Sequence, residues 1–145
     1  MNVFVTGGAG YIGSICVEQL LDAGHAVTVY DSLIEGHHAA VDPRARFVRA
    51  CLSDEARLLE ALTASGAQAV IHFAAHALVG ESMKNPGKYF GNTVGNGVKL
   101  LNAAVAVGVK KFVFSSTCAT YGPPEHVPIT EDTPQRPVNP YGESK

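Results

Sequence analysis

Short runs of strand-forming residues alternate along this chain with segments whose apolar residues recur at helical spacing. The runs are residues 2–6, 26–30, 46–50, 69–73 and 112–115, and most are almost continuously apolar. Such runs are typical of strands covered on both faces of a parallel sheet. The helical patterns cover residues 11–23, 54–64 and 88–107. The alternation predicts βαβ units and an α/β fold with a doubly wound parallel sheet.

Each helical pattern carries an expectation about its apolar face and its ends. Ser53 is the expected N-cap of the second helix, and Gly24, Gly66 and Gly108 are the expected stop residues. The predicted apolar faces consist of Ile12, Ile15, Cys16, Leu20 and Ala23, then Leu58, Leu59 and Leu62, and finally Phe90, Val94, Val98, Leu101 and Val105. Prolines crowd the stretch from 123 to 140, which predicts a long loop there.

Composition excludes several classes of partner. The chain has 145 residues and a formal net charge of −2, so no strong field favours nucleic acid or an anionic membrane. Strand-like residues follow Met1 at once and no apolar run reaches the ~18 residues of a membrane span, so a cytoplasmic protein is expected. Cys16, Cys51 and Cys118 share no metal-binding spacing, so we expect reduced, buried thiols.

A glycine-rich run joins the first predicted strand to the first predicted helix. Gly7, Gly10 and Gly13 permit a tight turn, close approach to a pyrophosphate and close packing of helix on strand. The free N–H groups of the following helix then face the phosphates. Asp31 ends the second strand, where a carboxylate binds ribose hydroxyls and repels a 2′-phosphate. These features predict a Rossmann-type site for NAD rather than NADP.

The predicted strand ends offer an independent test of this site. Ligands of parallel sheets bind beyond the carboxyl ends of the strands. Gly7, Asp31, Ala74 and Ser116 each follow a predicted strand, so we expect them along one edge.

Four segments together resemble UDP-sugar 4-epimerases of the extended short-chain dehydrogenase family: GGAGYIGS (7–14), HFAAHALVGES (72–82), SSTCATYG (115–122) and NPYGESK (139–145). The resemblance implies NAD-dependent interconversion of UDP-galactose and UDP-glucose, with hydride removed from and returned to sugar C4. It also implies a UDP-hexose substrate and a homodimeric parent enzyme. Residues 1–145 would then be an incomplete NAD-binding domain without the C-terminal sugar-nucleotide domain, and we expect this chain alone to be inactive.

The resemblance assigns the chemistry to a YxxxK pair, Tyr141 and Lys145, and to Thr117. The i, i+4 spacing places the pair on one helix face, where an ammonium favours the phenolate that acts as base. A helix that starts only at Pro140 is short, so we expect the pair to be poorly held. The implied cofactor contacts are Gly7, Gly10, Tyr11, Ile12, Gly13, Asp31, Ser32, Leu52, Phe73, Ala74, Ala75, Asn92, Ser115, Ser116, Tyr141 and Lys145, and the implied substrate contacts are Ser82, Thr117 and Tyr141.

Departures from the family pattern leave alternatives open. Cys51 stands where the family has an Asp that meets adenine, and Ala77 stands where many members have Lys, so NAD binding is expected to be weakened. Cys118 and Ala119 do not suit a dehydratase. A related epimerase or decarboxylase, a non-catalytic NAD-binding fragment and a remnant unable to fold stay open. No metal site is expected, and the histidines at 37, 38, 72 and 76 are interpreted as structural or exposed.

Overall fold

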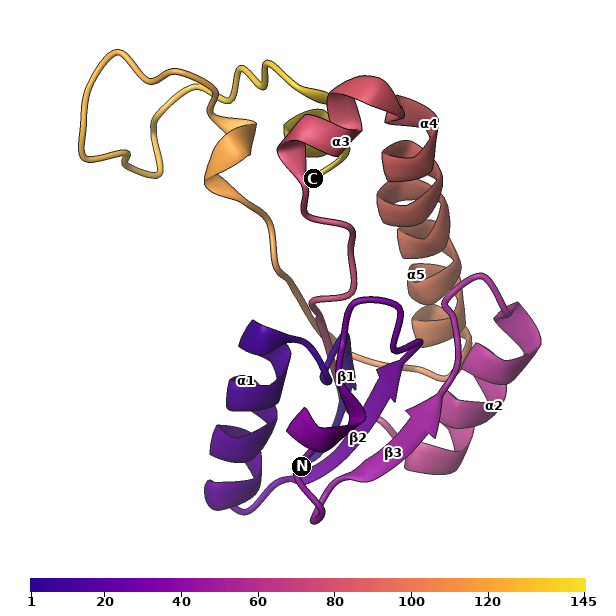
Figure 1. Ribbon diagram of the computed structural model, residues 1–145. Helices are drawn as coiled ribbons and strands as arrows, with labels where there is room; N and C mark the ends of the chain where they lie inside the picture. The colour runs from indigo at the N-terminus through magenta and orange to yellow at the C-terminus, as the bar shows by residue number, and fades with distance from the viewer. The chain divides into compact units, whose positions relative to one another are not determined.

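The computed structural model describes all residues from 1 to 145 and contains one five-stranded sheet (Figure 1). The strands are β1 (Asn2–Thr6), β2 (Ala26–Asp31), β3 (Arg46–Arg49), β4 (Ala69–His72) and β5 (Lys111–Phe114). All neighbouring strands are parallel, in the order β3-β2-β1-β4-β5. This order is that of the Rossmann fold, so the predicted fold class is confirmed. Every predicted strand is present, with ends displaced by one residue at most.

The chain divides into two compact units, described separately below. The first unit contains residues 1–74 and 96–115, with the sheet, α1 (Tyr11–Asp22), η1 (His38–Ala40), α2 (Glu55–Ser65) and α5 (Asn96–Ala106). The second contains residues 75–95 and 116–145, with α3 (Val79–Lys84), α4 (Pro86–Tyr89), the π-helix η2 (Phe90–Gly95), η3 (Cys118–Thr120) and α6 (Pro140–Ser144).

Side-chain alternation along the strands builds two cores in the first unit. Val5 and its alternate neighbours pack with Val17 of α1 on one face of the sheet. Phe4, pointing the other way, packs with Leu62 of α2 and Leu100 of α5. Successive residues of a strand point to opposite faces, so both faces need helices to cover them. Figure 1 shows α1 apart from α2, which lies beside α5.

The predicted apolar face of α1 is wrong in part, because Leu20 packs against the core as expected but Ile12 and Ile15 do not. Ile12 and Ile15 are exposed, Ile12 by 61%, whereas Gly13 and Val17 are buried. Because Gly13 has no side chain, α1 approaches the glycine turn on that side, and the helix is rotated accordingly. Leu59 of α2 is likewise exposed, contrary to expectation.

The third predicted helix differs most from expectation. Residues 88–107 contain the end of α4, the π-helix η2 and α5 rather than one regular helix. Gly91 and Gly95 favour the helical conformation weakly, and π-turns arise where regular pairing is interrupted. Leu100 and Ala104 are buried instead of the predicted face, whose residues Phe90, Val94, Val98, Leu101 and Val105 are all exposed.

The helix ends are largely as predicted. Gly24, Gly66 and Gly108 follow their helices with positive φ angles of 79°, 57° and 79°, which glycine adopts without strain. The N-cap of α2 is Asp54 rather than Ser53, because its carboxylate accepts the N–H of Arg57 at 3.0 Å.

Two further properties bear on the sequence-based expectations. All three cysteines are free, but Cys118 is exposed, so its expected burial is wrong. None of the helices combines the length and the apolar character that crossing a bilayer requires.

Candidate functional site

The glycine turn after β1 is closed by backbone contacts. The N–H of Gly7 donates to Tyr30 O at 3.0 Å, and Gly7 has a φ of 74°. A Cβ on Gly7 would lie 2.5 Å from Ala74 N, and one on Gly13 would overlap the carbonyl of Gly7. Both positions therefore exclude a side chain, as the sequence predicts.

The turn leads directly into the N-terminus of α1. Gly10 is the N-cap and brings no side chain to satisfy the N–H groups of the first helical turn. Tyr11 and Ile12 follow with exposed side chains. The helix start thus offers backbone donors and a positive dipole end to an anion, which is the chemistry needed to hold a pyrophosphate.

Asp31 ties the turn to the end of β2. Its Oδ2 accepts the N–H of Ala9 at 3.0 Å and its Oδ1 accepts the N–H of Leu33 at 2.8 Å, and the residue is buried. A carboxylate has about four acceptor positions, so capacity remains for ribose hydroxyls. Sequence reasoning missed the bond to Ala9, because nothing in the spacing of 9 and 31 indicates it. Ser32 accepts the N–H of Ile34 at 3.4 Å.

The carboxyl ends of the strands form one edge of the first unit. The N–H of Phe73 donates to Thr6 O at 2.9 Å and the N–H of Ser115 donates to His72 O at 3.1 Å, which continues the strand pairing past β4 and β5. Gly7, Asp31, Ala74 and Ser115 therefore gather there, whereas Ser116 belongs to the second unit. His72 itself is buried and pairs through Nδ1 with Thr6 Oγ1 at 2.6 Å, in agreement with a structural role.

The segment that follows β3 carries one departure from the family pattern, Cys51. Leu52 is buried in the core that contains Phe4, so its backbone rather than its side chain remains for a ligand. The hydroxyl of Tyr30 donates to Cys51 O at 3.0 Å and fixes the backbone at that position. Burial, assisted by nearby Asp54 and Cys51, raises the pKa of Tyr30 to about 12.

In the second unit, Asn92 and Ser82 have structural partners. Asn92 Oδ1, on the π-helix η2, accepts the N–H of His76 at 3.1 Å and so holds the segment after Ala75. Ser82 is fully buried and donates to Val79 O at 2.7 Å within its own helix. Its hydroxyl is therefore bound inside the fold.

Thr117, Tyr141 and Lys145 lie on neighbouring elements of the second unit. Thr117 Oγ1 accepts the N–H of Ala119 at 3.2 Å and caps η3. Tyr141 lies on α6, and Lys145 is the residue that directly follows this helix. The N–H of Lys145 donates to Tyr141 O at 3.2 Å. Burial lowers the pKa of the Lys145 ammonium.

The short helix α6 is held by packing, contrary to the expectation that its residues would be poorly held. Asn139 caps it by accepting the N–H of Gly142 at 2.7 Å. Gly142 lies so close to η3 that a Cβ would overlap the carbonyl of Ala119. Ser144 is buried and donates to Tyr141 O at 2.9 Å. Tertiary contacts therefore replace the length that an isolated helix needs.

The contact of Tyr89, a buried residue, with α6 was not predicted from the sequence. The ring of Tyr89, on α4, lies 6.3 Å from that of Tyr141 in an edge-to-face arrangement. Its hydroxyl bonds to Leu78 and Glu81, which precede it across the break at Pro86. No regular spacing relates these residues, so the sequence contained no signal for the contact.

The parallel sheet, the glycine turn and the acidic residue at the end of β2 define a Rossmann-type dinucleotide-binding protein. The model of the NAD dependent epimerase/dehydratase family matches residues 3–145, and the chain belongs to this family.

Curated proteins of similar sequence include epimerases that act on nucleotide sugars. A UDP-glucose 4-epimerase of Lacticaseibacillus casei is 54% identical over the whole chain, which spans 44% of that relative. A UDP-arabinose 4-epimerase of Arabidopsis thaliana is 46% identical over 99% of the chain and 36% of its own length. The crystal structure of UDP-glucose 4-epimerase from Brucella ovis in complex with NAD superposes with a TM-score of 0.95 at 47% identity, covering 99% of this chain and 44% of the other.

Proposed function

We propose that this chain is the NAD-binding part of an enzyme that interconverts UDP-galactose and UDP-glucose. The observation that carries the proposal is the combination of a side-chain-free glycine turn with Asp31 tied to it, in a chain 54% identical to a UDP-glucose 4-epimerase. The residues fit NAD: the turn leaves room for a pyrophosphate, and Asp31 keeps acceptor capacity for ribose hydroxyls while opposing a 2′-phosphate. The chain spans less than half of that relative, so a separate sugar-nucleotide domain belongs to the proposal.

When bound, NAD would supply the oxidised nicotinamide ring that accepts hydride from sugar C4 and returns it. Tyr141 is the base that removes the proton of the C4 hydroxyl, and Thr117 hydrogen-bonds that oxygen. Lys145 brings its ammonium to the end of the same helix, four residues after this base. The N-terminus of α1 would hold the pyrophosphate and Asp31 would hold the adenosine ribose. The other cofactor contacts implied by the family pattern, Ser115, Ser116 and Asn92 among them, are part of the same proposal.

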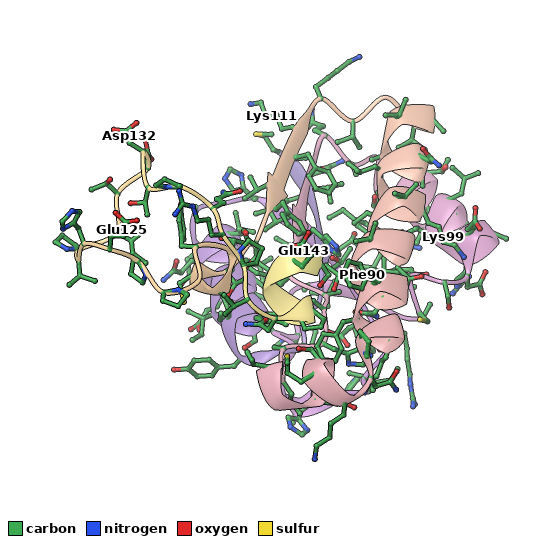
Figure 2. The ribbon with its side chains drawn as sticks, turned by 90° about the horizontal axis from the view of Figure 1, so that it is seen from above. Phe90, Lys99, Lys111, Glu125, Asp132 and Glu143 are labelled. Atoms are coloured by element: carbon green, nitrogen blue, oxygen red, sulfur yellow. The ribbon has the colours of Figure 1, made fainter.

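Binding measurements test the cofactor half of the proposal. We expect the chain to bind NAD more tightly than NADP in isothermal titration calorimetry. Asp31→Asn removes the charge that opposes the 2′-phosphate and one charge-assisted contact to the ribose. The ratio of the NAD and NADP affinities is therefore expected to shrink by about tenfold or more. Asp132→Asn, on the long loop far along the chain from the glycine turn (Figure 2), is the matched control and is expected to change nothing. Equal affinity for both cofactors in the unsubstituted chain would contradict the proposal.

Product analysis tests the reaction. A protein that carries this chain with a sugar-nucleotide domain is expected to convert UDP-galactose to UDP-glucose, and Tyr141→Phe is expected to abolish turnover. The 46% identity to a UDP-arabinose 4-epimerase makes UDP-arabinose the second substrate to assay. UDP-glucuronate distinguishes a uronate epimerase or decarboxylase. The 145-residue chain alone is expected to show no turnover, and retained NAD without turnover would leave it as a cofactor-binding fragment.

The exposed apolar side of α5 supports a homodimeric parent enzyme. Val98, Leu101 and Val105 lie on successive turns of this helix and are 46–76% exposed. A monomer rarely exposes such a row, whereas subunit interfaces use it.

A further inference from the structure

Hydrogen bonds hold the hydroxyl group of Tyr89 in place. The hydroxyl lies 2.7 Å from Leu78 O and 2.9 Å from Glu81 Oε2, and it accepts the N–H of Leu78 at 3.2 Å. The residue is completely buried. A buried phenol with donors and acceptors satisfied loses much of its freedom to rotate.

Glu81, which is hydrogen-bonded to this phenol, is in turn bound by Lys88. Its Oε1 lies 2.6 Å from Lys88 Nζ, and the two bonds from Lys88 and Tyr89 hold the pKa of the Glu81 carboxyl below its usual value. Lys88 comes from α4 and Glu81 from α3, so the ion pair joins the two helices. Side chains of this pair are about one-third exposed, which limits the strength of the ion pair but not its geometry.

The Tyr89 ring also contacts the ring of Tyr141, on α6. Its centroid lies 6.3 Å from that of Tyr141, with an interplanar angle of 80°, a favoured edge-to-face geometry. The α6 helix has only five residues, so the orientation of its side chains depends on what they pack against.

We propose that Tyr89, anchored by Glu81, Lys88 and the Leu78 backbone, is a positioning residue that sets the side-chain orientation of Tyr141. This inference deepens the proposed function, which it presupposes, since that function makes Tyr141 the base. A base must be held within hydrogen-bond reach of the proton that it removes. Tyr89 serves this need through the ring contact and does not itself touch the reacting atoms.

The orientation of Tyr141 is measurable by NMR on the full 145-residue chain labelled at its tyrosines, without NAD or substrate. The unsubstituted chain is expected to show a cross-peak between the ring protons of Tyr89 and Tyr141. Tyr89→Leu removes the ring. Because one aromatic contact is then lost, the population of the minor χ1 rotamer of Tyr141 is expected to rise about two- to tenfold. Tyr89→Phe keeps the ring but loses the anchored hydroxyl, so a smaller rise is expected.

Tyr121→Phe is the matched control, because Tyr121 belongs to the same unit and has no ring contact with Tyr141. The amide signal of Glu143, on α6 (Figure 2), reports whether that helix stays folded in each variant. An unchanged Tyr141 rotamer population in the folded Tyr89→Leu variant would overturn the proposal. If that variant does not fold, the cross-peak between the Tyr89 and Tyr141 rings tests the contact instead. Its absence from the unsubstituted chain would overturn the proposal equally. NAD titration of the same samples reports separately on the proposed function.

Discussion

At the scale of single residues, the positions that matter most are those where a side chain has no room or where one carboxylate serves two backbone groups. Gly13 is of the first kind, since a Cβ would overlap the carbonyl of Gly7. Asp31 is of the second kind, since it joins Ala9 to Leu33. The glycine was predictable from its place in the motif. The bond from the N–H of Ala9 to Asp31 was not, because it joins two turns that are distant in the sequence.

Gly13→Ala is expected to destabilise the chain by about 1–3 kcal/mol, as overpacking does, and to abolish NAD retention. Gly97→Ala is the control, because Gly97 lies inside α5 with open space where the Cβ would be. That change is expected to stabilise by about 0.5–1 kcal/mol. Urea unfolding of both variants measures the difference, and equal stability of the two would contradict the steric argument.

Tyr30 makes the stability of the first unit sensitive to alkaline pH. Its pKa is about 12 in the folded chain against an ordinary value of 10.0, because burial disfavours the phenolate. Between these values the unfolded chain loses the proton and the folded chain keeps it, so the free energy of unfolding falls as pH rises from 10 to 12. The stabilising contribution is fully present below pH 10.

Tyr30→Phe removes this titration, and its free energy of unfolding is expected to fall less steeply over the same pH window. Urea melts at a series of pH values measure both slopes. Parallel slopes would show that the Tyr30 phenol does not cause the loss.

At the scale of helices and strands, local sequence set the positions well and the buried faces poorly. The strands β1 to β5 lie within a residue of their predicted ends. The face of α1 was mispredicted at Ile12 and Ile15 because this helix is apolar on several sides, so periodicity cannot choose among them. The turn that closes against Gly13 makes the choice.

The cap of α2 gives a test at this scale. Asp54→Ala is expected to lower the free energy of unfolding by about 0.5–2 kcal/mol, because it removes the acceptor of the Arg57 N–H. Ser53→Ala, one residue earlier, is expected to have little effect, because no hydrogen bond of the Ser53 side chain accompanies the cap. Thermal melts of the two variants distinguish the caps, and a larger loss for Ser53→Ala would reverse the assignment.

At the scale of the whole molecule, the residues of the proposed function divide between the two units. The glycine turn and Asp31 belong to the first, and Thr117, Tyr141 and Lys145 belong to the second. The motifs predicted each group separately. The helical packing that supports α6 was not visible in them, since it depends on α3, which is too short for a periodic pattern.

Self-association through α5 is the prediction for the whole chain. Leu101→Glu places a charge on the exposed apolar row and is expected to shift sedimentation toward the monomer. Ala64→Glu adds the same charge to an exposed position of α2 and is expected to leave the distribution unchanged. A similar sedimentation distribution for both variants would show that α5 is not part of the interface.

The sequence by itself determined the positions of the strands along the chain, the glycine turn and the helix stops, whereas the order of the strands in the sheet came from the structure. These depend on backbone preferences and apolar runs that neighbouring residues along the chain impose. Tertiary structure alone decided which faces of α1 and α5 are buried, that Asp31 holds Ala9, and that Tyr89 lies against Tyr141. Each of these is a contact between segments distant in sequence, and its energy exists only once the partner surface has formed.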